Sequence, residues 1–235
     1  MPSPKYQQVV DFLTRNLAQL SEDGGSGSAL DFPDFELMPF DYLEFAEEEL
    51  EQNTPAARIN CVAHLKRAVE CELDTLLGVL NLSKQVRSFP KKLDFAKDAG
   101  IVSPRSLAKL NSMRNRMEHE YAIPEAQELE VYFDLASSFV HTLEGYIFML
   151  YGNTGMSWQC RSGTPLEFGV TLDGSPPRVQ FELVEGGVNT EVTFDVSPLS
   201  EYCEGLKIYF LMCRATALIR DRKSTRLNSS HGKLS

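Results

Sequence analysis

The chain has 235 residues, of which 43% are hydrophobic and 24% charged, and its formal net charge is −10 at pH 7. These fractions are typical of a globular protein with a substantial core, and they exclude a disordered or collagen-like chain. The sequence has no apolar run of about 18 residues and no basic and apolar start typical of a secretory signal, so we expect a cytoplasmic protein without membrane contact.

The five cysteines are odd in number and never spaced as CxxC, so they favour neither a disulfide framework nor a zinc site. They are Cys61, Cys71, Cys160, Cys203 and Cys213. The sequence also lacks a P-loop, a GxGxxG turn, an HExxH helix and a GxSxG elbow. We therefore expect reduced thiols, no metal ion and no cofactor.

The end of the chain, DRKSTRLNSSH (221–231), resembles the translation of a common sequencing adapter. We interpret residues 221–235 as an artefactual tail and exclude them from reasoning about the fold. The tail carries four basic residues and one acid, so the formal charge without it is −13. Its basic residues are not a sign of nucleic-acid binding.

The N-terminal part, residues 1–23, has apolar residues at a helical period and Pro4 in a position suited to a first helical turn. GGSGS (24–28) is typical of a flexible hinge. Residues 29–51 contain nine acids and no Lys or Arg, but their aromatic residues indicate packing rather than disorder. We expect an N-terminal helix, then a Gly/Ser hinge and acidic segment over 24–52 that ends in a helix near 40–52.

Residues 53–153 are predicted to form a helical domain. Thr54 and Pro55 are a cap and first-turn pair, and the apolar period that follows predicts a long helix over about 55–80. A loop leads to a shorter helix ending at Gly100, and the next helix is predicted from about 103 to 119. Pro124 stops that helix, and a second long helix is predicted over about 125–151.

Residues 154–220 change from the helical period to strict alternation in three runs, 166–172, 179–183 and 192–196. They predict a three-stranded antiparallel meander with one apolar face. A helix starting after Ser197 and Pro198 would cover that face, and a strand over 207–213 is the alternative. The predicted fold class is therefore mainly α, an up-down helical bundle followed by a small α+β unit.

Basic residues gather in one segment, 84–116, which holds nine cations and two acids. A local basic surface can attract a phosphate chain even in an acidic protein, because salt screens charges beyond about 10 Å. Packing against the acidic residues 29–51 is an equal alternative. The candidate substrate-binding cations are Lys91, Lys92, Arg105, Lys109 and Arg116.

The segment RNRMEHEY (114–121) contains the candidate catalytic residues Arg114, Asn115 and His119. His119 can transfer protons near neutral pH, Arg114 can bind a phosphate, and Asn115 shares a helix face with His119. This chemistry suits RNA cleavage without a metal, with a second copy supplying a second His. The alternative is a solvated helix end with two ion pairs, Arg114 to Glu118 and Arg116 to Glu120.

RNRMEHEY, placed between two long helices, resembles the motif of HEPN domains, an Arg followed by four to six residues and a His. The resemblance covers about 55–152 and implies a HEPN-like up-down bundle, a homodimer with a composite site, and a metal-independent endoribonuclease of toxin or defence systems. It assigns catalysis to Arg114, Asn115 and His119, and makes Tyr121 a candidate modification target of an antitoxin or other regulatory partner. Non-catalytic HEPN modules bind nucleotides or proteins, which is the alternative function.

Overall fold

The computed structural model describes residues 2–27, 31–102, 112, 115–116, 123–151, 154–160 and 162–231, with side chains up to residue 216. The chain divides into two compact units. The sheet unit contains Met1–Ala29 and Met149–Ser235, and the helical unit contains Leu30–Phe148. The helical unit is thus an insertion, in sequence, within the sheet unit. No helix of the described residues combines the length and the apolar character needed to cross a membrane.

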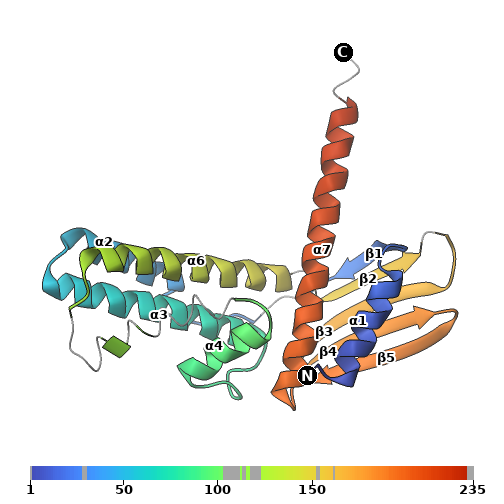
Figure 1. The fold of residues 1–235 in the computed structure, drawn as a ribbon, viewed down its shortest axis with the longest axis horizontal. Helices are drawn as coiled ribbons and strands as arrows, with labels where there is room; N and C mark the ends of the chain where they lie inside the picture. Colours follow the sequence, from blue (N-terminus) through green and yellow to red (C-terminus); the bar gives the residue numbers. More distant parts are fainter. Residues whose placement is uncertain are drawn as a thin grey trace. The chain divides into compact units, whose positions relative to one another are not determined.

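The sheet unit is built on one antiparallel sheet of five strands, arranged in the same order as in the sequence (Figure 1). The strands are β1 (Leu20–Ser26), β2 (Gly155–Cys160), β3 (Leu166–Gly174), β4 (Pro177–Glu185) and β5 (Val188–Asp195). The helical unit enters the chain between β1 and β2. The first strand and the other four strands therefore come from distant parts of the sequence.

One face of this sheet is apolar because alternate residues of each strand point to the same side. Phe181, at the centre, lies opposite Val170 on β3 and Val192 on β5, and all three side chains are buried. Two helices, α1 (Pro4–Asn16) and α7 (Leu199–His231), pack on the sheet (Figure 1). Covering the apolar face in this way creates the core of the unit.

Polar contacts fix α1 in its place beside α7 and the sheet. Ser3 caps α1, and its backbone N–H also donates to the Glu204 carboxylate of α7 over 3.1 Å. At the other end of α1, Arg15 and Asn16 donate to Glu185 of β4, over 3.0 and 3.2 Å. A helix at the N-terminus is confirmed, but it ends at Asn16 rather than near residue 23, because residues 20–23 belong to β1. It is part of the sheet unit.

The predicted fold class is wrong in two respects. The sheet has five strands rather than three, and the protein is mixed α and β rather than mainly α with a HEPN-like bundle. The predicted hinge was the source of one error, because Gly24–Ser26 belong to β1 and pair with residues 155–157 of β2. The three predicted strands are confirmed as β3, β4 and β5. Residues 207–213 are helical, so the predicted helix is confirmed and the alternative strand is wrong.

The helical unit contains the described helices α2 (Pro39–Gln52), α3 (Pro55–Val79), α4 (Phe89–Asp98) and α6 (Ala126–Leu150). They confirm the helices expected near 40–52, over 55–80, before Gly100 and over 125–151. α3 starts as predicted, with the Thr54 hydroxyl accepting from the Ala57 N–H over 3.1 Å. Most of the helix predicted over 103–119 lies outside the described residues.

Contacts along the helical unit define the directions of its long helices. Arg58, near the start of α3, donates to the carbonyl of Pro124, just before α6, over 3.4 Å. Phe40, at the start of α2, packs on His141, late in α6, with ring centroids 5.2 Å apart. α3 and α6 therefore run in the same direction, and α2 runs opposite to both.

The contact between α7 and β5 gives a test of the sheet unit. A Cβ atom added at Gly205 would lie 2.9 Å from Cβ and Cγ of Phe194, so Gly205→Ala should destabilise the unit by about 1–2 kcal/mol despite its better helix propensity. Trp158 is the only tryptophan and is buried in this unit, so its fluorescence during urea unfolding measures the change.

The control is Gly145→Ala in α6, where an added Cβ meets nothing within 4 Å. Because Gly145 lies in the helical unit, this variant should leave the Trp158 unfolding midpoint unchanged. Equal shifts of the unfolding midpoint in the two variants would contradict the close contact between Gly205 of α7 and Phe194 of β5.

Candidate functional site

The predicted catalytic trio is only partly covered by the structure. Arg114, His119 and Tyr121 lie outside the described residues, as do Arg105 and Lys109 of the predicted basic patch. Asn115 is described, in helical backbone with an exposed side chain. The geometry of Arg114 and His119 therefore stays a prediction.

Arg116 is the second described residue of the motif, and its guanidinium forms a two-pronged contact with Glu128 of α6. Nη1 and Nη2 donate to the two carboxylate oxygens over 3.2 and 3.3 Å. Such a paired geometry is the stronger form of an arginine–carboxylate contact. Arg116 is thus engaged with a side chain of α6.

The described part of the basic segment separates into exposed and buried cations. Lys84, Arg87, Lys91 and Lys97 have exposed side chains, as do the two acids, Asp94 and Asp98. Lys92 differs, because only 5% of it is exposed and its ammonium lies 2.7 Å from Asp74 and 3.5 Å from Glu70. Lys91 remains a candidate phosphate ligand, whereas the prediction that Lys92 belongs to the surface patch is wrong. Lys92 joins α4 to α3.

Adjacent lysines of α4 provide a matched test of this contact. Lys92→Met keeps the apolar stem but leaves two carboxylates without their cation, and should destabilise the protein by about 1–3 kcal/mol, since both acids are partly exposed and can be rehydrated. Lys91→Met, at an exposed position, should stay within about 0.5 kcal/mol. Urea unfolding followed by far-UV circular dichroism distinguishes the two, and equal effects would refute the structural role of Lys92.

A buried acid, Glu72, lies on the core side of α3 and was missed from sequence. Only 4% of the residue is exposed. Burial, and secondarily the nearby carboxylate of Glu144 on α6, raises the pKa of Glu72 from 4.5 to about 7. The signal was present in the spacing, because Leu65, Val69, Glu72 and Leu76 follow one another at intervals of four, three and four on the apolar stripe.

The raised pKa of Glu72 makes stability depend on pH. In the unfolded chain this carboxyl loses its proton at lower pH than in the folded protein, so folding is penalised as pH rises from about 4.5 to 7. Glu72→Gln removes the penalty. Between about pH 5 and pH 8, its free energy of unfolding should rise relative to wild type by about 2–3 kcal/mol.

Urea unfolding at the two pH values measures this difference. Glu47→Gln, at an exposed position of α2, is the control and should track wild type at both. A Glu72→Gln protein whose stability relative to wild type is the same at both pH values would refute the assignment.

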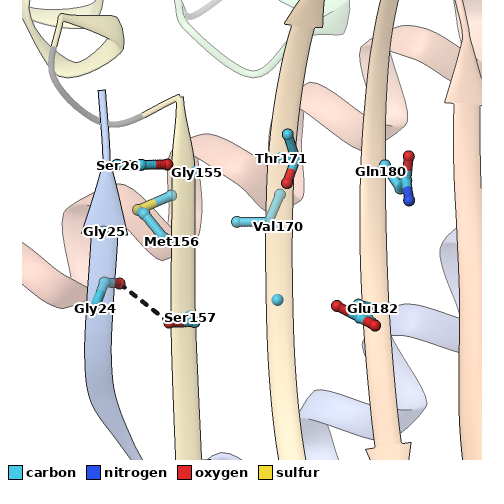
Figure 2. A pocket seen from close by; sticks show the side chains of 11 residues that line it. Gly24, Gly25, Ser26, Gly155, Met156, Ser157, Val170, Thr171, Gln180 and Glu182 are labelled. Carbon is cyan, nitrogen blue, oxygen red and sulfur yellow. Dashed lines mark hydrogen bonds between the residues drawn. The ribbon is translucent and has the colours of Figure 1, made fainter. Parts of the chain in front are cut away.

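A shallow hollow of about 330 Å³ lies on the sheet over β1 to β4 (Figure 2). It forms where small residues meet across the strands, and a Cβ at Gly155 would lie 2.5 Å from the hydroxyl oxygen of Ser26. Ser157 donates to the carbonyl of Gly24 over 3.4 Å. Figure 2 marks this hydrogen bond with a dashed line. Gln180 and Glu182 of β4 also line the hollow. Its chemistry is that of uncharged hydrogen-bonding groups with one carboxylate.

A second pocket, of about 420 Å³, lies in the helical unit against α3 and the segment before α2. We call it the acidic pocket. Its lining includes four carboxylates and two aromatic rings, from Asp34, Glu36, Glu70, Asp74, Phe35 and Tyr42. Glu70 and Asp74 are the two acids held by Lys92, so the contact behind the pocket also positions part of its wall.

All five cysteines are free thiols, of which Cys61, Cys203 and Cys213 are buried and Cys71 and Cys160 are partly exposed. Burial raises the pKa of Cys61 and Cys213 to about 11, so both thiols are protonated at neutral pH. Within the described part of the chain, no group of three or more His, Cys, Asp or Glu side chains could hold a metal ion.

Comparison of the chain with protein-family models, curated proteins and solved structures finds no match.

Proposed function

We propose that the segment RNRMEHEY binds and cleaves RNA without a metal ion, in the cytoplasm. The observation that carries the proposal is Asn115, the one residue of the predicted trio that the structure describes, whose side chain is exposed on helical backbone. A residue that contacts a polymeric substrate must be reachable in this way. The exposed cations of residues 84–98 support it, since Lys84, Arg87, Lys91 and Lys97 can attract phosphate groups.

In the proposed reaction, a ribose 2′-hydroxyl attacks the adjacent phosphorus and the bond to the 5′ oxygen breaks. The products are a 2′,3′-cyclic phosphate and a free 5′-hydroxyl. His119 takes the proton of the attacking hydroxyl or supplies one to the leaving oxygen, and Arg114 stabilises the negative charge that builds on the phosphate. Asn115 orients the His ring or a phosphate oxygen.

A homodimer completes this proposal, because one His cannot easily remove one proton and donate another in the same step. A second copy of the motif supplies the second His. Tyr121, two residues after His119, is the proposed target of a regulatory partner such as an antitoxin.

The second candidate function is a non-catalytic module that binds a nucleotide or a protein. The two-pronged contact of Arg116 with Glu128 favours it, because a cation of the motif is used there to hold two parts of the helical unit together. In that case Arg114 and His119 would bind a nucleotide or stabilise the fold without chemistry.

The test is cleavage of a labelled single-stranded RNA by the full chain in the presence of EDTA. Wild type should cleave, and His119→Ala and Arg114→Ala should each lose at least about 100-fold in rate. His141→Ala is the matched control, because His141 is exposed on α6. This variant should cleave at the wild-type rate. Circular dichroism verifies that each variant is folded.

Three results would decide against the nuclease. Wild type that never cleaves, or variants that cleave like wild type, refute it directly. Wild type that binds the RNA without cleaving it, with binding lost in Arg114→Ala, supports the non-catalytic module.

A further inference from the structure

The acidic pocket opens onto a surface with an unusual combination of charge and apolar side chains. Residues 31–52 contain nine acids and no Lys or Arg. None of the ion pairs formed between described residues involves these acids. Two of them accept hydrogen bonds within the helical unit, Asp41 from the Met38 N–H and Glu49 from Asn60. Of the others, Asp34 and Glu36 line the pocket, where no described cation pairs with them.

Apolar side chains are exposed in the same stretch of chain. They are Phe32, Leu37, Met38 and Phe40, each between 38% and 51% exposed. Apolar side chains exposed together, surrounded by charged residues, are typical of a surface that another protein covers. Leu37 also lines the pocket, so the exposed apolar segment and the pocket are continuous.

The inside of the pocket is shaped for a cationic side chain. Tyr42 lines it and stacks on His64 of α3, with ring centroids 6.4 Å apart, so this ring is held in place. Aromatic faces beside carboxylates attract an arginine or lysine head group, both through the ring and through the opposite charge. The carboxylates equally repel a phosphate chain, which disfavours RNA as the occupant.

One cation, Arg67 of α3, also lines the pocket, and it forms no ion pair with any described residue. Its guanidinium can donate to backbone carbonyls of a bound peptide. A small cation would leave Arg67 unused, whereas a peptide segment supplies both a basic side chain and carbonyl oxygens.

We propose that the acidic pocket and the exposed apolar residues beside it are a docking surface for a basic segment of a partner protein, one that combines Arg or Lys with aliphatic side chains. An Arg or Lys enters the pocket between Tyr42 and the carboxylates of Asp34 and Glu36. Aliphatic residues of the same segment cover Leu37 and Met38. This function does not involve Arg114, Asn115 or His119, and it stands or falls independently of RNA cleavage.

The experiment measures binding of a fluorescein-labelled peptide of arginine, leucine and serine residues to the full chain by fluorescence anisotropy. The double variant Asp34→Asn, Glu36→Gln should weaken binding about tenfold, since it removes two partly solvated charge pairs with the peptide. Tyr42→Leu should weaken it about threefold through loss of the ring interaction. A peptide with glycine in place of leucine should bind about fivefold more weakly.

The matched control is Glu47→Gln, Glu48→Gln, which removes the same charge from exposed positions of α2 outside the pocket. It should change affinity less than twofold. Equal weakening by the two double variants would show attraction by net charge alone and overturn the proposal, as would absence of binding by wild type. Sedimentation of wild type and of Asp34→Asn, Glu36→Gln tests a second copy as the occupant, and self-association lost only in that variant would overturn the partner assignment.

Discussion

The pairing of β1 with β2 is the contact on which the rest of the structure depends. β1 forms one edge of the sheet and pairs only with β2. The two strands lie far apart in the sequence: beside this pairing, the Thr154 hydroxyl donates to the carbonyl of Ser26, 128 residues earlier. If the intervening chain were unfolded, the length-dependent part of closing so long a loop would cost about 4 kcal/mol. The inserted residues fold into a unit of their own, which reduces that cost by limiting the conformations of the insertion before the strands meet.

Within the helical unit, polar groups inside the structure determine what its surface offers. The buried ammonium of Lys92 holds Glu70 and Asp74 together on one side of α3, and both acids form part of the acidic pocket. Glu72, on the core side, has no such cation and instead has a raised pKa. Acids two residues apart on one helix thus have opposite environments, because Glu70 and Asp74 contact a lysine whereas Glu72 faces α6.

The sequence was sufficient where local signals decide the structure. Thr54 and Pro55 located the start of α3, and the alternation around Phe168, Phe181 and Phe194 located β3, β4 and β5. It failed for β1, because LSEDGGS has neither alternating apolar residues nor β-branched ones, and its pairing is supplied by the main chain of β2. Glycines that allow a close strand contact were interpreted as a hinge, since the partner strand is not visible in the local sequence.

The candidate site shows the same limit for side chains. Counting charges grouped Lys91 with Lys92, but only the three-dimensional contact with α3 shows that one is exposed and the other buried. The spacing of Arg114, Asn115 and His119 stays a sequence-based prediction of chemistry. The acidic pocket could not be predicted, because its walls come from α3, α2 and the segment before α2. The sequence indicated only that the acidic stretch also carries aromatic residues.

The order of the strands also has a consequence for synthesis on the ribosome. β1 is made first, but its partner β2 emerges only after the whole helical unit, so at about 5–20 residues per second β1 waits roughly 6–26 s without a neighbour. During that time the helical unit can fold alone. An unpaired strand is a template for unwanted association, and the charged and glycine-rich composition of LSEDGGS makes β1 a poor one. The same composition that makes β1 hard to predict from sequence therefore lowers its tendency to associate while the sheet is incomplete.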